Sequence, residues 1–192
     1  MVRKQLSIHR PHQNQGLLGE LALLSDEMRA ALFAALDAYE ALGIRFALVG
    51  GLAVGSYAEP RATKDIDFLV GDEAFTRRGA IIAFAQPMPL QAFQVPIDPI
   101  PLPEAEARHG RLQAGLLNPV IDRTTGRAIA ILPANELAYM KLASARPKDR
   151  GDIVALVLAG KAELEVLESW TQEDAELSAA LAKVRTELEA EE

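Results

Sequence analysis

The chain is 192 residues long and 49% hydrophobic, which is enough to bury one core, or one core with a small satellite, without disulfide or metal staples. It contains no cysteine, which excludes disulfides, thiolate zinc or iron–sulfur sites and catalysis by a thiol. Its formal net charge of −7 opposes non-specific binding to polyphosphate chains, so we expect no DNA partner, and any RNA contact would need a local basic patch.

The N-terminal part of the chain is predicted to contain an arm followed by a helix. Residues 1–20 mix polar residues with proline and glycine, without periodicity and without an apolar run long enough for a signal peptide or a membrane span. We therefore expect a soluble, cytoplasmic protein with no membrane partner.

A helix and a strand are predicted next. Ser25 is a suitable N-cap, apolar residues repeat at helical spacing up to Leu42, and Gly43 is suited to end the helix. A short apolar run over residues 44–49 then predicts a buried strand.

A glycine pair and an aspartate pair mark the next predicted turn and strand. The glycines at positions 50–51 directly follow the apolar run, and a short helix is expected at residues 52–57. Residues 64–70 predict a second strand. Because side chains alternate along a strand, Asp65 and Asp67 are expected on one face and their apolar neighbours on the other.

Prolines interrupt the middle of the chain. Residues 76–84 predict a short helix, after which six of the eleven prolines fall between positions 87 and 103. Because proline interrupts sheet ladders, any strand here is expected at an edge, and residues 93–100 are the best candidate. The later elements expected are a helix, a strand and two helices, at residues 104–117, 128–132, 134–144 and 148–158, and one or two amphipathic helices from residue 161.

These elements predict an α/β (α+β) fold, in which a small mixed sheet is flanked by helices and followed by an α-helical C-terminal extension. The domain organisation expected is an N-terminal arm at residues 1–20, a core at 21–133 and an α-helical region at 134–192. The order strand, turn, helix and strand would bring the glycine turn and both aspartates to one end of the sheet.

The pair Asp65 and Asp67 is the first candidate functional feature. Like charges held this close are unfavourable unless a cation lies between them. Mg²⁺, with Mn²⁺ as the alternative, prefers hard oxygen ligands and keeps positions open for phosphate oxygens. An isolated Asp-x-Asp is more often a solvated strand face. The glycine turn fourteen residues upstream of Asp65 has uncovered N–H groups and precedes a helix, so it can cradle a phosphate and favours the metal site.

Two blocks of sequence carry a family resemblance. The first runs from Leu48-Val-Gly-Gly to Pro60-Arg-Ala-Thr-Lys-Asp-Ile-Asp-Phe-Leu-Val70. The second runs from Glu136 to Ile153 and contains a lysine, an arginine and a Lys-Asp-x-x-Asp stretch. The first resembles the signature of the polymerase-β-type nucleotidyltransferase superfamily, particularly its minimal and AbiEii-like members, and the second resembles the helical segment that follows the catalytic sheet in AbiEii-like proteins.

The resemblance implies roles for individual residues. It makes Asp65 and Asp67 metal ligands and Gly50 and Gly51 a phosphate-contacting turn. It also implies a third carboxylate on a neighbouring strand, for which Asp98 is the candidate. In the family that residue completes the metal site and can act as a base on the attacking hydroxyl; the alternative is a turn aspartate flanked by prolines.

Cationic residues are expected to contact the triphosphate or the acceptor. The resemblance implies this role for Lys141, Arg146 and Lys148, because a transferring phosphoryl group needs cationic partners as its charge redistributes. Arg61 and Thr63 would shape the loop before the metal strand, Arg61 as an anchor or as a phosphate contact. Lysines on helices are usually solvated, and it is the second block that favours a substrate role for Lys141.

The function implied is Mg²⁺-dependent transfer of a nucleoside monophosphate from a nucleoside triphosphate, such as ATP, to an acceptor hydroxyl. Resemblance to AbiEii-like proteins implies an acceptor on tRNA or on a protein, and the toxin of a toxin–antitoxin system with a cognate antitoxin as partner. Two alternatives stay open: a non-catalytic nucleotide-binding or antitoxin-like protein with the same scaffold, and a structural module that uses the C-terminal helices.

Overall fold

The structure, a computed structural model, describes residues 16, 24–60, 62–78, 81–144 and 146–191. Its elements in chain order are α2 (Asp26–Leu42), β1 (Phe46–Leu48), α3 (Gly50–Tyr57), β2 (Ile66–Val70), the 3-10 turn η1 (Asp72–Ala74), β3 (Phe75–Arg78), β4 (Ile81–Phe84), β5 (Gln91–Ala92), β6 (Val95–Pro101), α4 (Glu106–Leu117), β7 (Val120–Asp122), β8 (Ile129–Ile131), α5 (Ala134–Ser144), α6 (Pro147–Leu158), α7 (Leu164–Thr171) and α8 (Ala175–Glu191). No helix in these ranges is long and apolar enough to cross a membrane.

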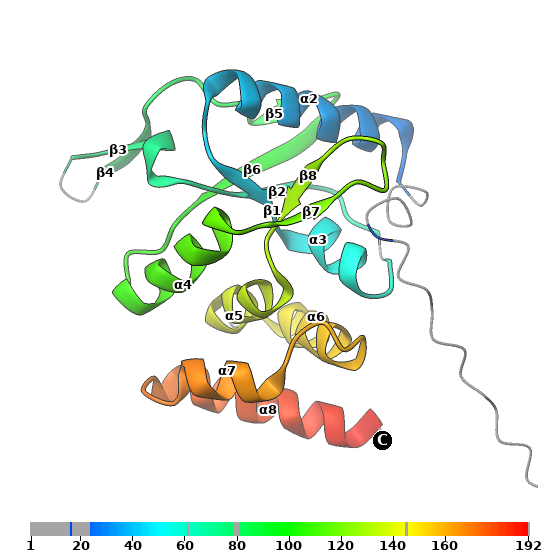
Figure 1. The fold of residues 1–192 in the computed structure, drawn as a ribbon, viewed down its shortest axis with the longest axis vertical. Coiled ribbons are helices and arrows are strands. Elements are labelled where there is room, and N and C mark those ends of the chain that lie inside the picture. The colour runs from blue at the N-terminus through cyan, green and yellow to red at the C-terminus, as the bar shows by residue number, and fades with distance from the viewer. Residues whose placement is uncertain (1–15, 17–23, 61, 79–80, 145, 192) are drawn as a thin grey trace, which may run out of the picture.

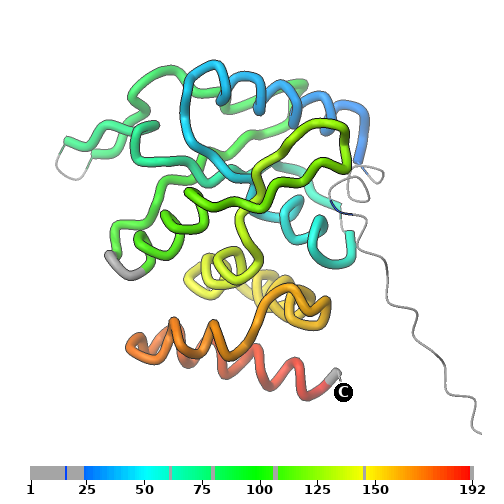
Figure 2. Tube along the Cα trace, viewed as in Figure 1, coloured from blue at the N-terminus to red at the C-terminus, as the bar shows by residue number. Residues whose placement is uncertain are grey.

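The elements form layers around a mixed six-stranded sheet with strand order β5-β6-β2-β1-β8-β7. Helix α2 covers one face of the sheet, and α3, α4 and α5 lie on the other side (Figure 1). Helix α6 lies beside α5 and also contacts α3, and α7 and α8 pack on the side of this pair that faces away from the sheet, as the trace in Figure 2 shows. The predicted α/β architecture, with a mixed sheet flanked by helices and an α-helical C-terminal part, is therefore confirmed.

Strand pairing decides which residues meet at the end of the sheet. Strand β1 is antiparallel to β2 and parallel to β8, and β2 is parallel to β6. In this register Leu48, the last residue of β1, lies opposite Phe68, and Asp67 lies opposite Asp98. Residues directly opposite each other in neighbouring strands share a face. The register therefore places two acidic side chains beside each other, close to the point where β1 ends.

Helix α2 fixes which face of β2 is apolar. Its predicted boundaries are confirmed, because the Ser25 hydroxyl accepts a backbone N–H of the first turn and Gly43 ends the helix at φ 66°. The ring of Tyr39, on α2, packs edge-on against Phe68 with centroids 5.0 Å apart and an interplanar angle of 89°. Because Phe68 faces α2, the neighbouring Asp67 faces the opposite side, where α3 and α5 lie.

Strand β6 contains prolines and still forms a ladder with β2. The N–H of Ile97 donates to the carbonyl of Leu90, away from β2, at 3.0 Å. Because N–H groups alternate in direction along a strand, Pro99 and Pro101 lack an N–H on that same outer side. There β5 pairs only with the first residues of β6. Strand β6 is second in the strand order, outside which lies only β5 among the described strands. The predicted edge position therefore applies only to the part of β6 beyond β5, where the prolines lack donors that no described strand would accept.

The segment predicted as a helix at residues 76–84 is instead an antiparallel hairpin of β3 and β4, so that prediction was wrong. Phe75 pairs with Phe84, and their ring centroids lie 5.4 Å apart. β-Branched and aromatic residues favour an extended backbone, and cross-strand pairing outweighs a helical pattern that covers barely two turns. The prediction also omitted β7, a three-residue strand too short to give a periodic signal.

Candidate metal and nucleotide site

Three carboxylates from two parts of the chain converge at one end of the sheet. Asp65 directly precedes β2, Asp67 lies within β2, and Asp98 lies in the adjacent β6. One oxygen from each of the three lies within 4.8 Å of the others. This donor set could hold a metal ion. The structure therefore brings together the three carboxylates that the sequence predicts as ligands.

The electrostatics of this cluster fit a divalent cation. Burial is the largest cause that raises the pKa of Asp67, and the charges of Asp65 and Asp98 act in the same direction. The pKa rises from 3.8 to about 6, although Lys141 and Lys148 act to lower it. Three carboxylates this close together repel one another when ionised. A cation bound by hard oxygen ligands would supply the missing charge. The residues present thus fit Mg²⁺ or Mn²⁺ on the chemistry of their donors.

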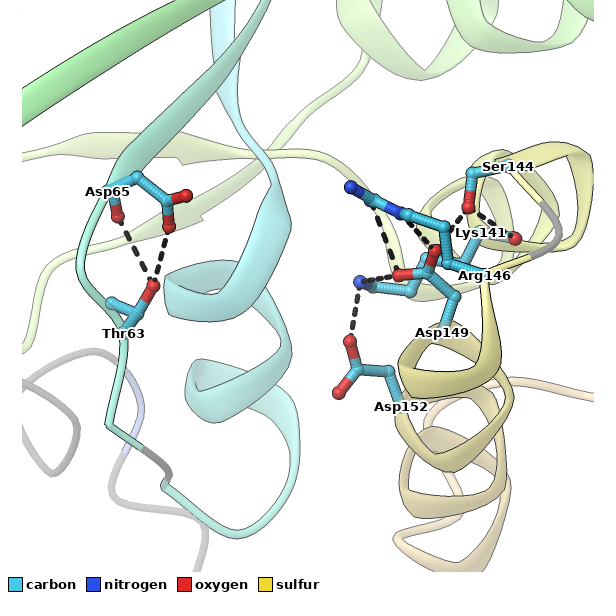
Figure 3. A network of polar contacts seen from close by, with 7 residues as sticks. All are labelled: Thr63, Asp65, Lys141, Ser144, Arg146, Asp149 and Asp152. Carbon is cyan, nitrogen blue, oxygen red and sulfur yellow. Dashed lines mark hydrogen bonds and ion pairs between the residues drawn. The ribbon is translucent and has the colours of Figure 1, made fainter.

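One hydrogen bond orients the carboxylate of Asp65, and another fixes the backbone at Asp67. The Thr63 hydroxyl donates to Asp65 Oδ1 at 2.9 Å, as Figure 3 shows. The backbone carbonyl of Asp67 accepts the N–H of Val49 at 2.9 Å, which ties β2 to the start of the glycine turn. Thr63 thus contacts Asp65 in the loop before β2, and its predicted role toward a nucleotide stays a prediction. Arg61 lies outside the described residues, and its proposed role stays a prediction.

At Gly50 the absence of a side chain leaves space for the carboxylate of Asp67. Gly50 begins α3 with φ 65°, in the left-handed region that favours glycine. A Cβ atom at this position would lie 1.8 Å from Asp67 Oδ2, far inside a van der Waals contact. Gly51 follows it at the N terminus of the same helix. Gly50 thus permits a close approach between the turn and Asp67, a role that the expected phosphate contact alone did not indicate.

A cavity of about 350 Å³ opens beside the carboxylates. The carboxylates and the glycine turn line it on the side of the sheet, and residues of β6, α5 and the start of α6 line the rest. The sequence-predicted residues that line this cavity are Gly50, Gly51, Thr63, Asp65, Asp67, Asp98, Lys141, Arg146 and Lys148. The fold therefore gathers both sequence blocks around one cavity.

Lys141 lines the cavity as part of a buried polar network. Its side chain is 7% exposed, and its Nζ lies 3.2 Å from Asp149 Oδ1 and 2.6 Å from Asp152 Oδ2 (Figure 3). Burial alone would raise the pKa of Asp149, but hydrogen bonds from Ser144 and Arg146 and the charge of Lys141 lower it overall. The charge of Lys141 is thus shared by two carboxylates within the protein, which weakens its expected action on a triphosphate.

Arg146 and Lys148 are the more accessible cations of the cavity. The Arg146 side chain is 60% exposed, and its Nε donates to Asp149 Oδ2 at 2.7 Å. This hydrogen bond raises the pKa of Arg146, and the charges of Asp149, Asp67 and Asp65 add to the effect. In Figure 3 the guanidinium of Arg146 points toward the side of the cavity that carries Asp65. Lys148, in the first turn of α6, is exposed and also lines the cavity.

Sequence reasoning missed four further lining residues: Ile100, Leu137, Met140 and Ser144. Ile100 follows Asp98 by two positions and therefore shares its strand face. Leu137 and Ser144 lie at i−4 and i+3 from Lys141, and Met140 lies at i+3 from Leu137 and i−4 from Ser144, along one side of α5. Extending each predicted site residue by the period of its own element would have found Ile100, Leu137 and Ser144, and a second step along α5 would have found Met140.

Comparison with known proteins concerns the fold only. The structure is similar to the crystal structure of an antigenic nucleotidyltransferase-like protein from Paracoccidioides brasiliensis, with a TM-score of 0.46 and 19% sequence identity over 83% of this chain and 94% of that chain. No family model matches the chain, and no curated protein matches it. A likeness of this degree carries no information about activity, which leaves the geometry of the cavity as the basis for a functional argument.

Proposed function

We propose that the cavity is the active site of a Mg²⁺-dependent nucleotidyltransferase, which moves a nucleoside monophosphate from a nucleoside triphosphate to an acceptor hydroxyl. The observation that carries this proposal is the convergence of Asp65, Asp67 and Asp98 within 4.8 Å on one wall of a cavity that also contains Arg146 and Lys148. A metal-binding carboxylate cluster facing accessible cations suits a substrate that is itself a metal–polyphosphate complex.

Each group of residues has a defined part in the proposed reaction. Asp65, Asp67 and Asp98 would hold Mg²⁺, which when bound neutralises charge on the triphosphate. Arg146 and Lys148 bind the phosphates and stabilise the charge that moves to the leaving group. The acceptor oxygen forms a bond to the α-phosphorus, the bond from that phosphorus to the bridging oxygen of pyrophosphate breaks, and pyrophosphate leaves. The proton of the acceptor hydroxyl moves to an Oδ atom of Asp98, the most exposed of the three carboxylates.

Transfer of label from α-³²P nucleoside triphosphates to cellular RNA or protein tests the enzyme proposal. Wild-type protein with Mg²⁺ should transfer label, and Asp67→Asn and Asp98→Asn should not, although both variants should fold. Asp37→Asn, on the exposed surface of α2, is the matched control and should behave as wild type. Binding of the nucleotide with Mg²⁺ but without transfer, in wild type and variants alike, would favour the non-catalytic nucleotide-binding alternative.

The acceptor is a second part of the proposal and is supported by the resemblance to AbiEii-like proteins alone. We infer tRNA, or else a protein, as the acceptor, and growth inhibition in the cytoplasm as the consequence, relieved by a cognate antitoxin. Separation of the label into RNA and protein fractions distinguishes the two acceptors. Expression of wild-type protein should slow growth and Asp67→Asn should not; equal growth of both would refute the toxin role and leave the transferase proposal intact.

A further inference from the structure

The cavity lining combines charged and polar side chains with three apolar ones, which are Ile100, Leu137 and Met140. Ile100 lies on the same face of β6 as Asp98, two residues further along the strand. On α5 the cavity-lining residues change from Leu137 and Met140 to Lys141 with progress along the helix. Both the strand wall and the helix wall therefore add apolar side chains to the charged ones. A nucleotide has the same division between its phosphates and its base.

The neutral polar side chains that line the cavity are already engaged. The Thr63 hydroxyl donates to Asp65 Oδ1 at 2.9 Å. The Ser144 hydroxyl bonds the Lys141 carbonyl at 3.0 Å and also contacts the carboxylate of Asp149. Among the described residues lining the cavity, the other side chains are charged or apolar. Both hydroxyl protons are therefore engaged within the protein, so among the described lining residues no neutral side chain offers a free donor to a base edge.

We propose that Ile100, Leu137 and Met140 form a base-facing wall, which holds the nucleobase by apolar contact without reading its hydrogen-bonding edge. The site then accepts purine and pyrimidine nucleoside triphosphates alike. This inference rests on the proposed function, since it assumes that the cavity binds a nucleoside triphosphate. A site that hydrogen-bonds its substrate can reject analogues by about 10⁴-fold, whereas apolar contact discriminates far less.

Met140 is the most informative member of the wall. It is partly exposed, whereas Leu137 is 1% exposed and belongs to the core. A methionine side chain is flexible and polarisable, so it adapts to rings of different size and makes favourable sulfur–aromatic contacts. Shortening it should remove contact with the base and leave the phosphate end of the cavity unchanged.

Binding measurements with non-transferable ligands test the inference. The α,β-methylene analogues of ATP, GTP, CTP and UTP, and inorganic tripolyphosphate, are titrated into the full chain with Mg²⁺ by calorimetry. We expect the four analogues to bind wild type within about tenfold of one another. Met140→Ala should weaken all four by about fivefold and leave tripolyphosphate unchanged. Met88→Ala, another partly buried methionine but outside the cavity lining, is the control and should change neither.

The outcomes separate this inference from the proposed function. If wild type binds neither the analogues nor tripolyphosphate, both are overturned. If it binds one analogue about 100-fold more tightly than the other three, or if Met140→Ala leaves the analogues unchanged or weakens tripolyphosphate equally, only the base-facing wall is overturned. Should Met140→Ala fail to fold, Ile100→Ala, at a partly exposed position of the same wall on β6, gives the same comparison.

Discussion

Substitution of Gly50 by alanine probes the carboxylate cluster without altering any charge. Two effects are expected. Alanine must adopt φ near 65°, and its Cβ would lie 1.8 Å from Asp67 Oδ2. Gly43→Ala provides a matched control, because Gly43 has φ 66° and a Cβ there meets nothing within 4 Å. The pair of variants thus separates backbone strain from displacement of the carboxylate.

The magnitudes follow from the two geometries. A left-handed φ costs alanine roughly 1–2 kcal/mol, and this cost should be similar at both positions because their φ angles agree. The protein should stay folded, because a typical domain is stable by about 5–15 kcal/mol. At Gly50 the atoms that clash belong to the Asp67 side chain, so this side chain must move away from its position in the cluster. We expect metal affinity to fall at least roughly 10- to 100-fold, the range seen when groups that orient metal ligands are lost.

Urea unfolding, Mn²⁺ binding followed by electron paramagnetic resonance, and label transfer measure these effects side by side. Gly43→Ala should lose stability and keep metal binding and transfer, whereas Gly50→Ala should lose all three. Equal Mn²⁺ affinity in the two variants would refute the reasoning, since it would mean that displacing Asp67 leaves the metal site intact.

Four further substitutions give three independent checks. Lys141→Ala should lower the free energy of unfolding by roughly 3–5 kcal/mol, because it leaves two buried carboxylates without their counter-ion. Lys148→Ala should change the free energy of unfolding by less than about 0.5 kcal/mol and should weaken nucleotide binding. Urea unfolding measures the stability of each variant, and nucleotide titration measures its affinity. Asp98→Asn should raise the melting temperature of the metal-free protein, because it removes a like charge from the cluster. It should also abolish the increase in melting temperature that Mg²⁺ causes in wild type. An increase equal to that of wild type would show that Asp98 is not a ligand. The hydrogen bond from Arg45 lowers the pKa of Glu73 from 4.5 to about 2. The stability that this pair contributes is therefore complete above about pH 4.5 and is lost as the pH falls toward 2. Unfolding followed by circular dichroism should show Glu73→Gln less stable than wild type at pH 6, with a smaller difference at pH 2.5.

Much of the fold could be predicted because its signals are local. The N-cap at Ser25 and the C-terminal glycine at Gly43 act through hydrogen bonds within one helical turn, so residue type and spacing are enough to place α2. The alternation that puts Asp65 and Asp67 on one strand face is likewise a property of the extended backbone. The hairpin at residues 75–84 gave no such signal, because its two strands are stabilised mainly by each other.

The sequence by itself determined which residue types were available for a metal and a phosphate site, and the tertiary structure decided which of them meet. Asp98 joins the other carboxylates because β6 pairs with β2 in one particular register, and a shift by one residue would turn its side chain to the opposite face. Lys141 is buried between two carboxylates of α6 because α5 and α6 pack together. This is a contact between two separate helices, and residue spacing along the sequence does not specify it. These arrangements depend on strand register and helix packing, which are set by the burial of the whole core and are not encoded in any short stretch of the chain.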